Sequence, residues 1–157
     1  MAIISVERLI NNKENNKIVT DLILKDTSGK CFSNKDIEGN IIPVKDIANI
    51  YLEYTKMYGI KYDDRCVGLL SLTNDNEVSI FIEPDYHRMG IGRQSQVIFE
   101  RILREEYKLD SLVAEATPDN TASLKLLNIM GYKKTGESRE VPINDNNVLV
   151  EKYVKKL

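Results

Sequence analysis

The segment that most constrains the fold runs from residue 77 to residue 107, where an apolar strand, a glycine loop and an amphipathic helix follow one another. In EVSIFIEP, Val78, Ile80 and Ile82 share one face of a strand, and Pro84 ends it because proline cannot donate to a ladder. The loop HRMGIG comes next, and apolar residues then recur at helical spacing. This order is typical of anion-binding sites, since loop amides and the helix N-terminus point at the anion together.

Known phosphate loops fit this segment only in part. A P-loop requires GxxxxGK[ST], which is absent. A dinucleotide fingerprint requires a third glycine where Ser95 stands, within a repeated βαβ pattern that the chain lacks. The loop by itself therefore leaves two interpretations open, an anion-binding loop and a tight turn between a strand and a helix.

The rest of the chain alternates strand and helix patterns. Strands are predicted at 3–10, 66–73 and 111–117, and helices at 18–24, from Pro43 onward and at 121–130. Near the C-terminus the pattern predicts a hairpin that turns at INDNN. The segments TSGK (27–30) and EGN (38–40) are typical of loops. In the second helix Tyr51, Tyr54 and Tyr58, with Met57 beside them, predict a core stripe. The order indicates one α/β domain with a mixed, mostly antiparallel sheet flanked by about four helices.

Composition excludes several classes of protein. The chain has 157 residues, enough for one domain with a real core, and its net charge of −2 argues against a nucleic-acid partner. Two distant cysteines, Cys31 and Cys66, are expected to be reduced and structural, and with the lone His87 they offer no metal site. We find neither a signal peptide nor an apolar run of membrane-spanning length, so we expect no membrane partner and a cytoplasmic location.

A second segment gives the loop a context. Asn120 and Ser123 begin the predicted helix 121–130, which ends at Gly131 and Tyr132. These residues form a motif in which Asn is followed, after two residues, by Ser or Ala, and then by a helix that ends in Gly and an aromatic residue. With the loop upstream, joined by one helix and one strand, this motif resembles the GNAT superfamily of acetyl-CoA-dependent N-acetyltransferases. The resemblance covers about residues 66–135 well and the C-terminal hairpin loosely.

The loop matches the acetyl-coenzyme-A loop of that family with one departure. Ile82 and Pro84 match the usual strand end, and Gly90 and Gly92 match its glycines, whereas His87 stands where Arg or Gln is usual. Since backbone amides do most of the phosphate binding, this departure affects a side-chain role and leaves the site in place. The resemblance implies cofactor contacts from Phe81, Ile82, His87, Arg88, Met89, Gly90, Ile91, Gly92, Arg93, Asn120 and Ser123.

The same resemblance implies that residues 1–157 form one N-acetyltransferase domain with three parts. Residues 1–60 would border the acceptor site with a strand and two helices, 66–135 would form the acetyl-CoA-binding core, and 132–157 would form a β-hairpin. One or two residues of the tyrosine stripe would then shape the acceptor site. The expected partner is an unidentified amine acceptor, and homodimerisation is possible.

The implied reaction moves an acetyl group from a thioester to an amine, which requires a proton acceptor and an oxyanion donor. Glu77, at the start of the central strand, and Glu115, in the next strand, are the candidate bases; each is alternatively a solvated or ion-paired surface charge. A strand amide near Phe81 or Ile82 would hold the oxyanion. Many family members place a tyrosine acid where Leu127 stands, so Tyr86 is the candidate acid if one is needed.

Two other functions remain open from the sequence. The chain could be a catalytically weak or inactive coenzyme-A-binding sensor of the same fold, because Leu127 and His87 both depart from the family. It could also be an unrelated nucleotide-binding α/β domain, although the missing lysine and third glycine disfavour that class.

Overall fold

The computed structural model describes residues 2–26, 31–32, 34–36, 38–143 and 146–157 as two antiparallel sheets and four α-helices. The first sheet has the order β1-β2-β3-β4, with β1 Ile4–Leu9, β2 Lys56–Tyr62, β3 Arg65–Leu72 and β4 Val78–Ile82. The second has the order β5-β7-β6, with β5 Ser111–Ala116, β6 Lys133–Ile143 and β7 Asn146–Lys156. The helices are α1 Lys13–Ile23, α2 Val44–Tyr54, α3 Ile91–Glu105 and α4 Thr121–Ile129, with a 3₁₀ turn at Pro84–Tyr86.

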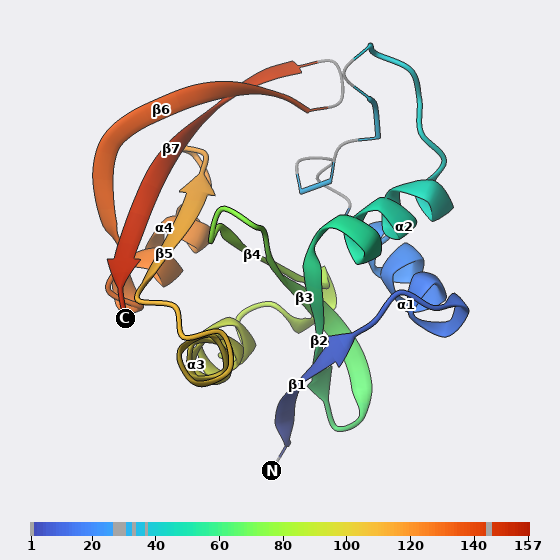
Figure 1. Ribbon diagram of the computed structural model, residues 1–157, viewed down its shortest axis with the longest axis horizontal. Coiled ribbons are helices and arrows are strands. Elements are labelled where there is room, and N and C mark those ends of the chain that lie inside the picture. Colours follow the sequence, from blue (N-terminus) through green and yellow to red (C-terminus); the bar gives the residue numbers. More distant parts are fainter. Residues whose placement is uncertain (1, 27–30, 33, 37, 144–145) are drawn as a thin grey trace.

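Helices cover both faces of the first sheet. Figure 1 shows α1 and α2 together on one side and α3 on the other. Under α1 and α2, a cluster that includes Val19, Leu52 and Leu69 is buried. On the other face Phe99 of α3, fully buried, packs in a larger cluster with Leu70 and residues of β5 and α4. The sheet is therefore buried on both faces, which explains why β3 reads as an almost continuous apolar run.

The two sheets meet at one point and then part. Glu77 and Val113 form a parallel bridge, in which the Val113 N–H donates to the Asn76 carbonyl at 3.0 Å. Beyond it no ladder joins β4 to β5 in the described part of the chain. The β6–β7 hairpin arches away beside β5, as Figure 1 shows. Two strands that diverge from one bridge leave a cleft between them.

The tyrosine stripe was predicted on one helix, and this prediction is wrong for Tyr58 and Met57. Helix α2 ends at Tyr54, where Thr55 turns extended (φ −127°, ψ 161°). Tyr58 then lies in β2, a strand that the helical pattern had concealed. Because β2 pairs with β1 on one edge and β3 on the other, strand pairing outweighed the local helical spacing.

The other elements lie close to their predicted positions. Helix α1 begins earlier than expected, at Lys13, because the side chain of Asn12 accepts a hydrogen bond from the Asn15 N–H and caps it. The predicted loop at 27–30 and part of the predicted turn INDNN, at 144–145, lie outside the described residues. No helix in the described ranges is both long and apolar enough to cross a membrane.

Candidate active site

The parting of β4 and β5 encloses a cleft of about 520 Å³. Ser79, Ile80 and Phe81 of β4 form one wall, and residues 114–117 form the other. The start of α4 contributes Asn120 and Ser123. Tyr51 and Met57 also line the cleft. Tyr54 is exposed on the surface and Tyr58 is buried in the core, so the predicted tyrosine stripe is divided between three environments.

Backbone groups of β4 face this cleft in alternation. The Thr73 N–H donates to the Glu77 carbonyl at 2.9 Å, and the Glu83 N–H donates to the Val67 carbonyl at 2.8 Å. In an antiparallel pair alternate residues bond to the neighbour, so the amides of Ile80 and Ile82 point away from β3 and toward β5. Of the two residues predicted near the oxyanion, Phe81 lines the cleft, whereas Ile82 has its amide on the β5 side of the strand.

The glycine loop meets the cleft at His87. His87 lines it, and Gly92 lies where an added Cβ would touch Ile82 and Leu126 at 3.4 and 3.5 Å. Gly90 precedes α3 with a φ of +77°, a conformation that glycine adopts without strain. The ring nitrogen Nε2 of His87 lies 2.6 Å from the Ile82 carbonyl oxygen, so this histidine ties the loop to the end of β4.

The loop also carries unused donors. The first amides of α3 have no acceptor within the helix, and in the described part of the chain no loop carbonyl accepts from the amides of residues 88–93. Arg88 and Arg93 are exposed beside them. Free amides, a helix N-terminus and two guanidinium groups fit a phosphate-bearing ligand.

Asn120 has a structural task as well as a place in the cleft. Its side-chain oxygen accepts a hydrogen bond from the Ser123 N–H at 3.1 Å and caps α4. The cap fixes the start of α4 at the cleft, where both residues of the second motif are brought together with the glycine loop.

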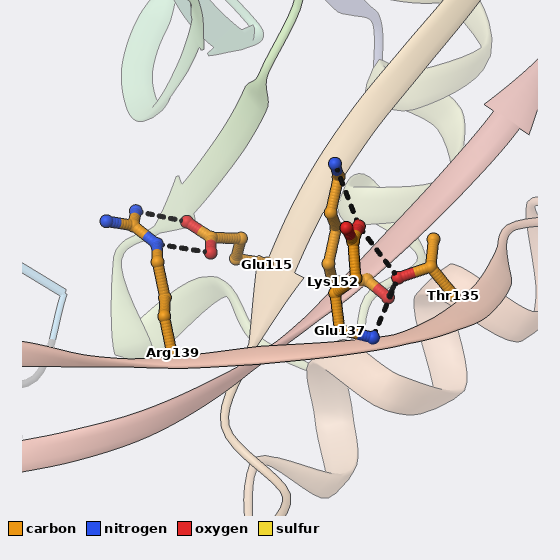
Figure 2. A network of polar contacts seen from close by, with 5 residues as sticks. All are labelled: Glu115, Thr135, Glu137, Arg139 and Lys152. Atoms are coloured by element: carbon orange, nitrogen blue, oxygen red, sulfur yellow. Dashed lines mark hydrogen bonds and ion pairs between the residues drawn. The ribbon is translucent and has the colours of Figure 1, made fainter.

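Glu115 is held by an arginine from the hairpin. Arg139, on β6, donates from Nε and Nη2 to the two carboxylate oxygens at 2.7 and 2.5 Å, and Figure 2 shows the two side chains meeting across the strands. The hydrogen bonds from Arg139 lower the pKa of the Glu115 carboxyl. Glu115 is therefore anionic at neutral pH and a weak proton acceptor.

Glu77 has the opposite electrostatic environment. Burial raises the pKa of its carboxyl, and the charge of Glu115 and a hydrogen bond between the two carboxyl groups raise it further. Both residues, with Arg139, line a second cavity of about 430 Å³ next to the first, and Glu115 lines both cavities. Two carboxyl groups whose pKa values are pushed apart form the usual setting for one proton acceptor and one fixed charge.

The candidate acid lies outside the cleft. Tyr86 is not among the residues that line the cleft; its ring packs against Tyr62 at 5.6 Å, with the Arg65 guanidinium 5.4 Å from its centroid. Leu127, in the place of the family's tyrosine, is buried and does line the cleft. Glu83 is buried at the end of β4 and pairs with Arg65 at 3.3 Å, which makes it a structural anion.

Arg139 was not predicted. It lies in a hairpin whose sequence is polar and whose residues are mostly exposed, so no local pattern marks it. Figure 2 also shows the neighbouring contacts of Glu137 with Lys152, at 3.1 Å, and with Thr135. Within the described residues no group of three or more His, Cys, Asp or Glu side chains could hold a metal ion.

The comparisons with known proteins agree with this geometry. The family model described as acetyltransferase (GNAT) family matches residues 25–132, and the chain therefore belongs to that family. Membership confirms the predicted family, the fold and the class of enzyme, an acyltransferase that takes its acetyl group from acetyl-CoA. The roles of individual residues stay predictions.

Solved structures share the fold at low sequence identity. RimL, a ribosomal L7/L12 alpha-N-protein acetyltransferase in complex with coenzyme A, is 16% identical with a TM-score of 0.76, over 98% of this chain and 94% of that one. The ribosomal-protein-S5-alanine acetyltransferase from Vibrio fischeri is 13% identical with a TM-score of 0.77, over 99% and 96%. The ribosomal-protein-S18-alanine N-acetyltransferase from Escherichia coli is 16% identical with a TM-score of 0.69, over 99% and 94%. Comparison with curated protein sequences gave no match.

Proposed function

We propose that this protein moves the acetyl group of acetyl-CoA directly to a primary amine, with both substrates bound at once. One observation carries the proposal, namely the contents of the cleft between β4 and β5. The loop with free backbone N–H groups meets this cleft at His87, and Glu115, which is hydrogen-bonded to Glu77, lies in its wall. The loop is suited to a pyrophosphate, and the carboxyl pair is suited to proton transfer. A ligand lying along the cleft would reach both.

The loop supports binding of the acetyl donor. Amides of residues 88–93 would face the pyrophosphate, and the guanidinium groups of Arg88 and Arg93 would add charge. Asn120 and Ser123 line the same cleft from α4. The amide contacts depend on backbone directions, so we expect them to persist although His87 replaces the usual Arg or Gln.

Glu77 is the residue that we propose as proton acceptor. A primary amine arrives largely as an ammonium ion, since the pKa is about 10.4 for a lysine-like amine and about 8 for a protein N-terminus, and it must lose a proton before its nitrogen can attack the thioester carbonyl carbon. The raised pKa of Glu77 makes its carboxylate a better base, either directly or through a water molecule. Glu115, kept anionic by Arg139, supplies the fixed charge that raises it.

The amide of Ile80, a residue that lines the cleft, or the amide of Ile82, which points to the same side of β4, would stabilise the oxyanion that forms on this attack. The carbon–sulfur bond then breaks and the thiolate departs. A thiol pKa of about 8.5 makes the thiolate an adequate leaving group, so a general acid is not essential. This fits a cleft in which Leu127 replaces the usual tyrosine and from which Tyr86 is absent.

The acceptor is proposed only as a class, the primary amine of a small molecule or of a protein N-terminus. Structural neighbours are described as acting on ribosomal proteins, and a protein N-terminus is the acceptor that this similarity favours. The division of the chain into an acceptor-bordering part (1–60), a cofactor core (66–135) and a hairpin (132–157) stays a proposal. So do the cytoplasmic location and a homodimer.

A second candidate function follows from Leu127. A cleft that binds coenzyme A without a general acid also suits a catalytically weak or inactive sensor of the same fold. Turnover separates the two functions, and binding alone does not.

The test has two stages. Coenzyme A and acetyl-CoA are expected to raise the melting temperature of the protein, and an absence of stabilisation by either would remove both functions. Release of free thiol from acetyl-CoA is then measured with a panel of polyamines, aminoglycosides and N-terminal peptides. Thiol release that depends on one amine class supports the enzyme, whereas binding without release supports the sensor.

A further inference from the structure

Gln96 is a buried polar residue on the apolar face of α3. Its side chain is on the same face as Phe99 and Leu103, three and seven positions later, which are both fully buried. Gln96 is itself only 5% exposed. A glutamine in this row interrupts a core pattern, and a buried polar group normally has a partner.

The side-chain oxygen of Gln96 has no such partner. Oε1 is buried, and no donor in the described part of the chain reaches it. Gln96 also lines the cleft, as do Ala114 and Ala116 of β5. A buried and unpaired acceptor on a residue of the cleft wall gains a partner if a bound ligand brings a donor to it.

The place of Gln96 along α3 indicates which part of a ligand it meets. It stands four positions after Gly92, which is about 6 Å along the axis at 1.5 Å per residue. Coenzyme A continues from its pyrophosphate into the pantetheine arm, which carries two amide groups before the thiol. With the pyrophosphate at the loop amides, the arm passes the level of Gln96.

We propose that Gln96 Oε1 accepts a hydrogen bond from an amide N–H of the pantetheine arm. This inference rests on the proposed function, because it places the pyrophosphate at residues 88–93. It assigns to α3 a contact beyond the glycine loop, made by a side chain inside the cleft. Without ligand the unpaired oxygen costs stability, and the bound arm removes that cost.

The variant Gln96→Met tests the contact, because methionine is unbranched like glutamine and has no strong acceptor. Its dissociation constant for coenzyme A should be about tenfold weaker, the loss of one hydrogen bond. Binding of the nucleotide half of coenzyme A, with its pyrophosphate and without the arm, should stay within about twofold. The melting temperature without ligand should equal or exceed that of the unmodified protein.

Gln94→Met provides the matched control, because Gln94 is an exposed glutamine on the same helix. It should leave both affinities unchanged. If Gln96→Met fails to fold, Gln96→Leu replaces it with the same expectations. The inference is overturned if the affinity for coenzyme A does not fall, or if both ligands weaken equally. A failure of the unmodified protein to bind coenzyme A would instead overturn the proposed function, and the inference with it.

Discussion

The two ends of the cleft are built in different ways. At the loop end, the proposed donors are backbone amides of six consecutive residues, 88–93, set by the turn at Gly90. At the other end, Glu115 lines the cleft, and Glu77 and Arg139 line the adjoining cavity. These three residues come from separate parts of the chain and act through their side chains. A backbone site tolerates side-chain changes and depends on conformation. A site built from side chains tolerates few substitutions, because each charged group shifts the pKa of its neighbours.

His87 illustrates the tolerance of the loop end. It departs from the residue usual in the family, yet its ring contacts the Ile82 carbonyl and the loop keeps its turn at Gly90. Arg139 illustrates the opposite case, since it alone gives Glu115 a bidentate partner. Mutations at the two ends should therefore differ in size and in kind.

The largest effect is expected for Glu77→Gln. Loss of the proton acceptor should lower turnover of acetyl-CoA with its best amine by about 100-fold or more, while affinity for coenzyme A stays unchanged. Glu53→Gln, an exposed position on α2, is the control. If Glu77→Gln and Glu115→Gln both retained full turnover in the thiol assay, the assignment of the base would be wrong.

The same variant should not lose stability at neutral pH. The folded-state pKa of Glu77 is raised, so its neutral form favours folding, and that contribution is present at low pH and lost as pH rises through the folded pKa. Glutamine mimics the neutral form at every pH. Denaturant unfolding at neutral pH should give Glu77→Gln a free energy of unfolding equal to or above that of the unmodified protein.

Arg139→Gln should have the next largest effect, and it should depend on pH. Arg139 lowers the pKa of both Glu115 and Glu77, so its removal raises both. The acid limb of the kcat/KM profile should move to higher pH, with about a tenfold loss on that limb and less above it. Because Arg139 is 61% exposed, stability should change by less than about 1 kcal/mol. Arg101→Gln is the control. If the acid limb of the Arg139→Gln profile did not move relative to this control, the electrostatic role of Arg139 would be contradicted.

At the loop end, Gly90→Ala should weaken coenzyme A binding by about tenfold, since a side chain at positive φ shifts the amides. Gly136→Ala is a matched control: Gly136 has a φ of +88°, against +77° for Gly90, and an added Cβ would meet nothing within 4 Å. Each variant should cost about 1 kcal/mol of folding stability. Calorimetric titration should show weaker coenzyme A binding for Gly90→Ala and not for Gly136→Ala. Equal affinities of the two variants would argue against a role of the loop amides in binding.

The smallest effect is expected for His87→Gln, which restores a residue usual in the family. Affinity for coenzyme A should change by less than about threefold, because the amides bind the phosphates and the imidazole only supports the loop. A loss as large as that of Gly90→Ala would show that the loop end depends on a side chain after all.

Local patterns were sufficient for most of the fold. Strand β4, the glycine loop and α3 follow from alternation, proline and helical spacing, each of which acts over a few residues. Strand β2 could not be found this way, since Tyr58 continues a helical row and only pairing with β1 and β3 makes it extended. Gln96 did leave a signal, a polar residue in an apolar row, but the unpaired state of its oxygen is a property of the packed core.

The sequence alone predicted the loop end of the cleft, because a phosphate loop and its helix are contiguous in the chain and their residue types are dictated by backbone geometry. It also supplied Glu77 and Glu115 as candidates. Only the tertiary structure distinguished their environments, by bringing Arg139 from the hairpin onto Glu115 and leaving Glu77 half-buried beside the pair. Charges interact through space, and the neighbours that set a pKa need not be neighbours in the chain.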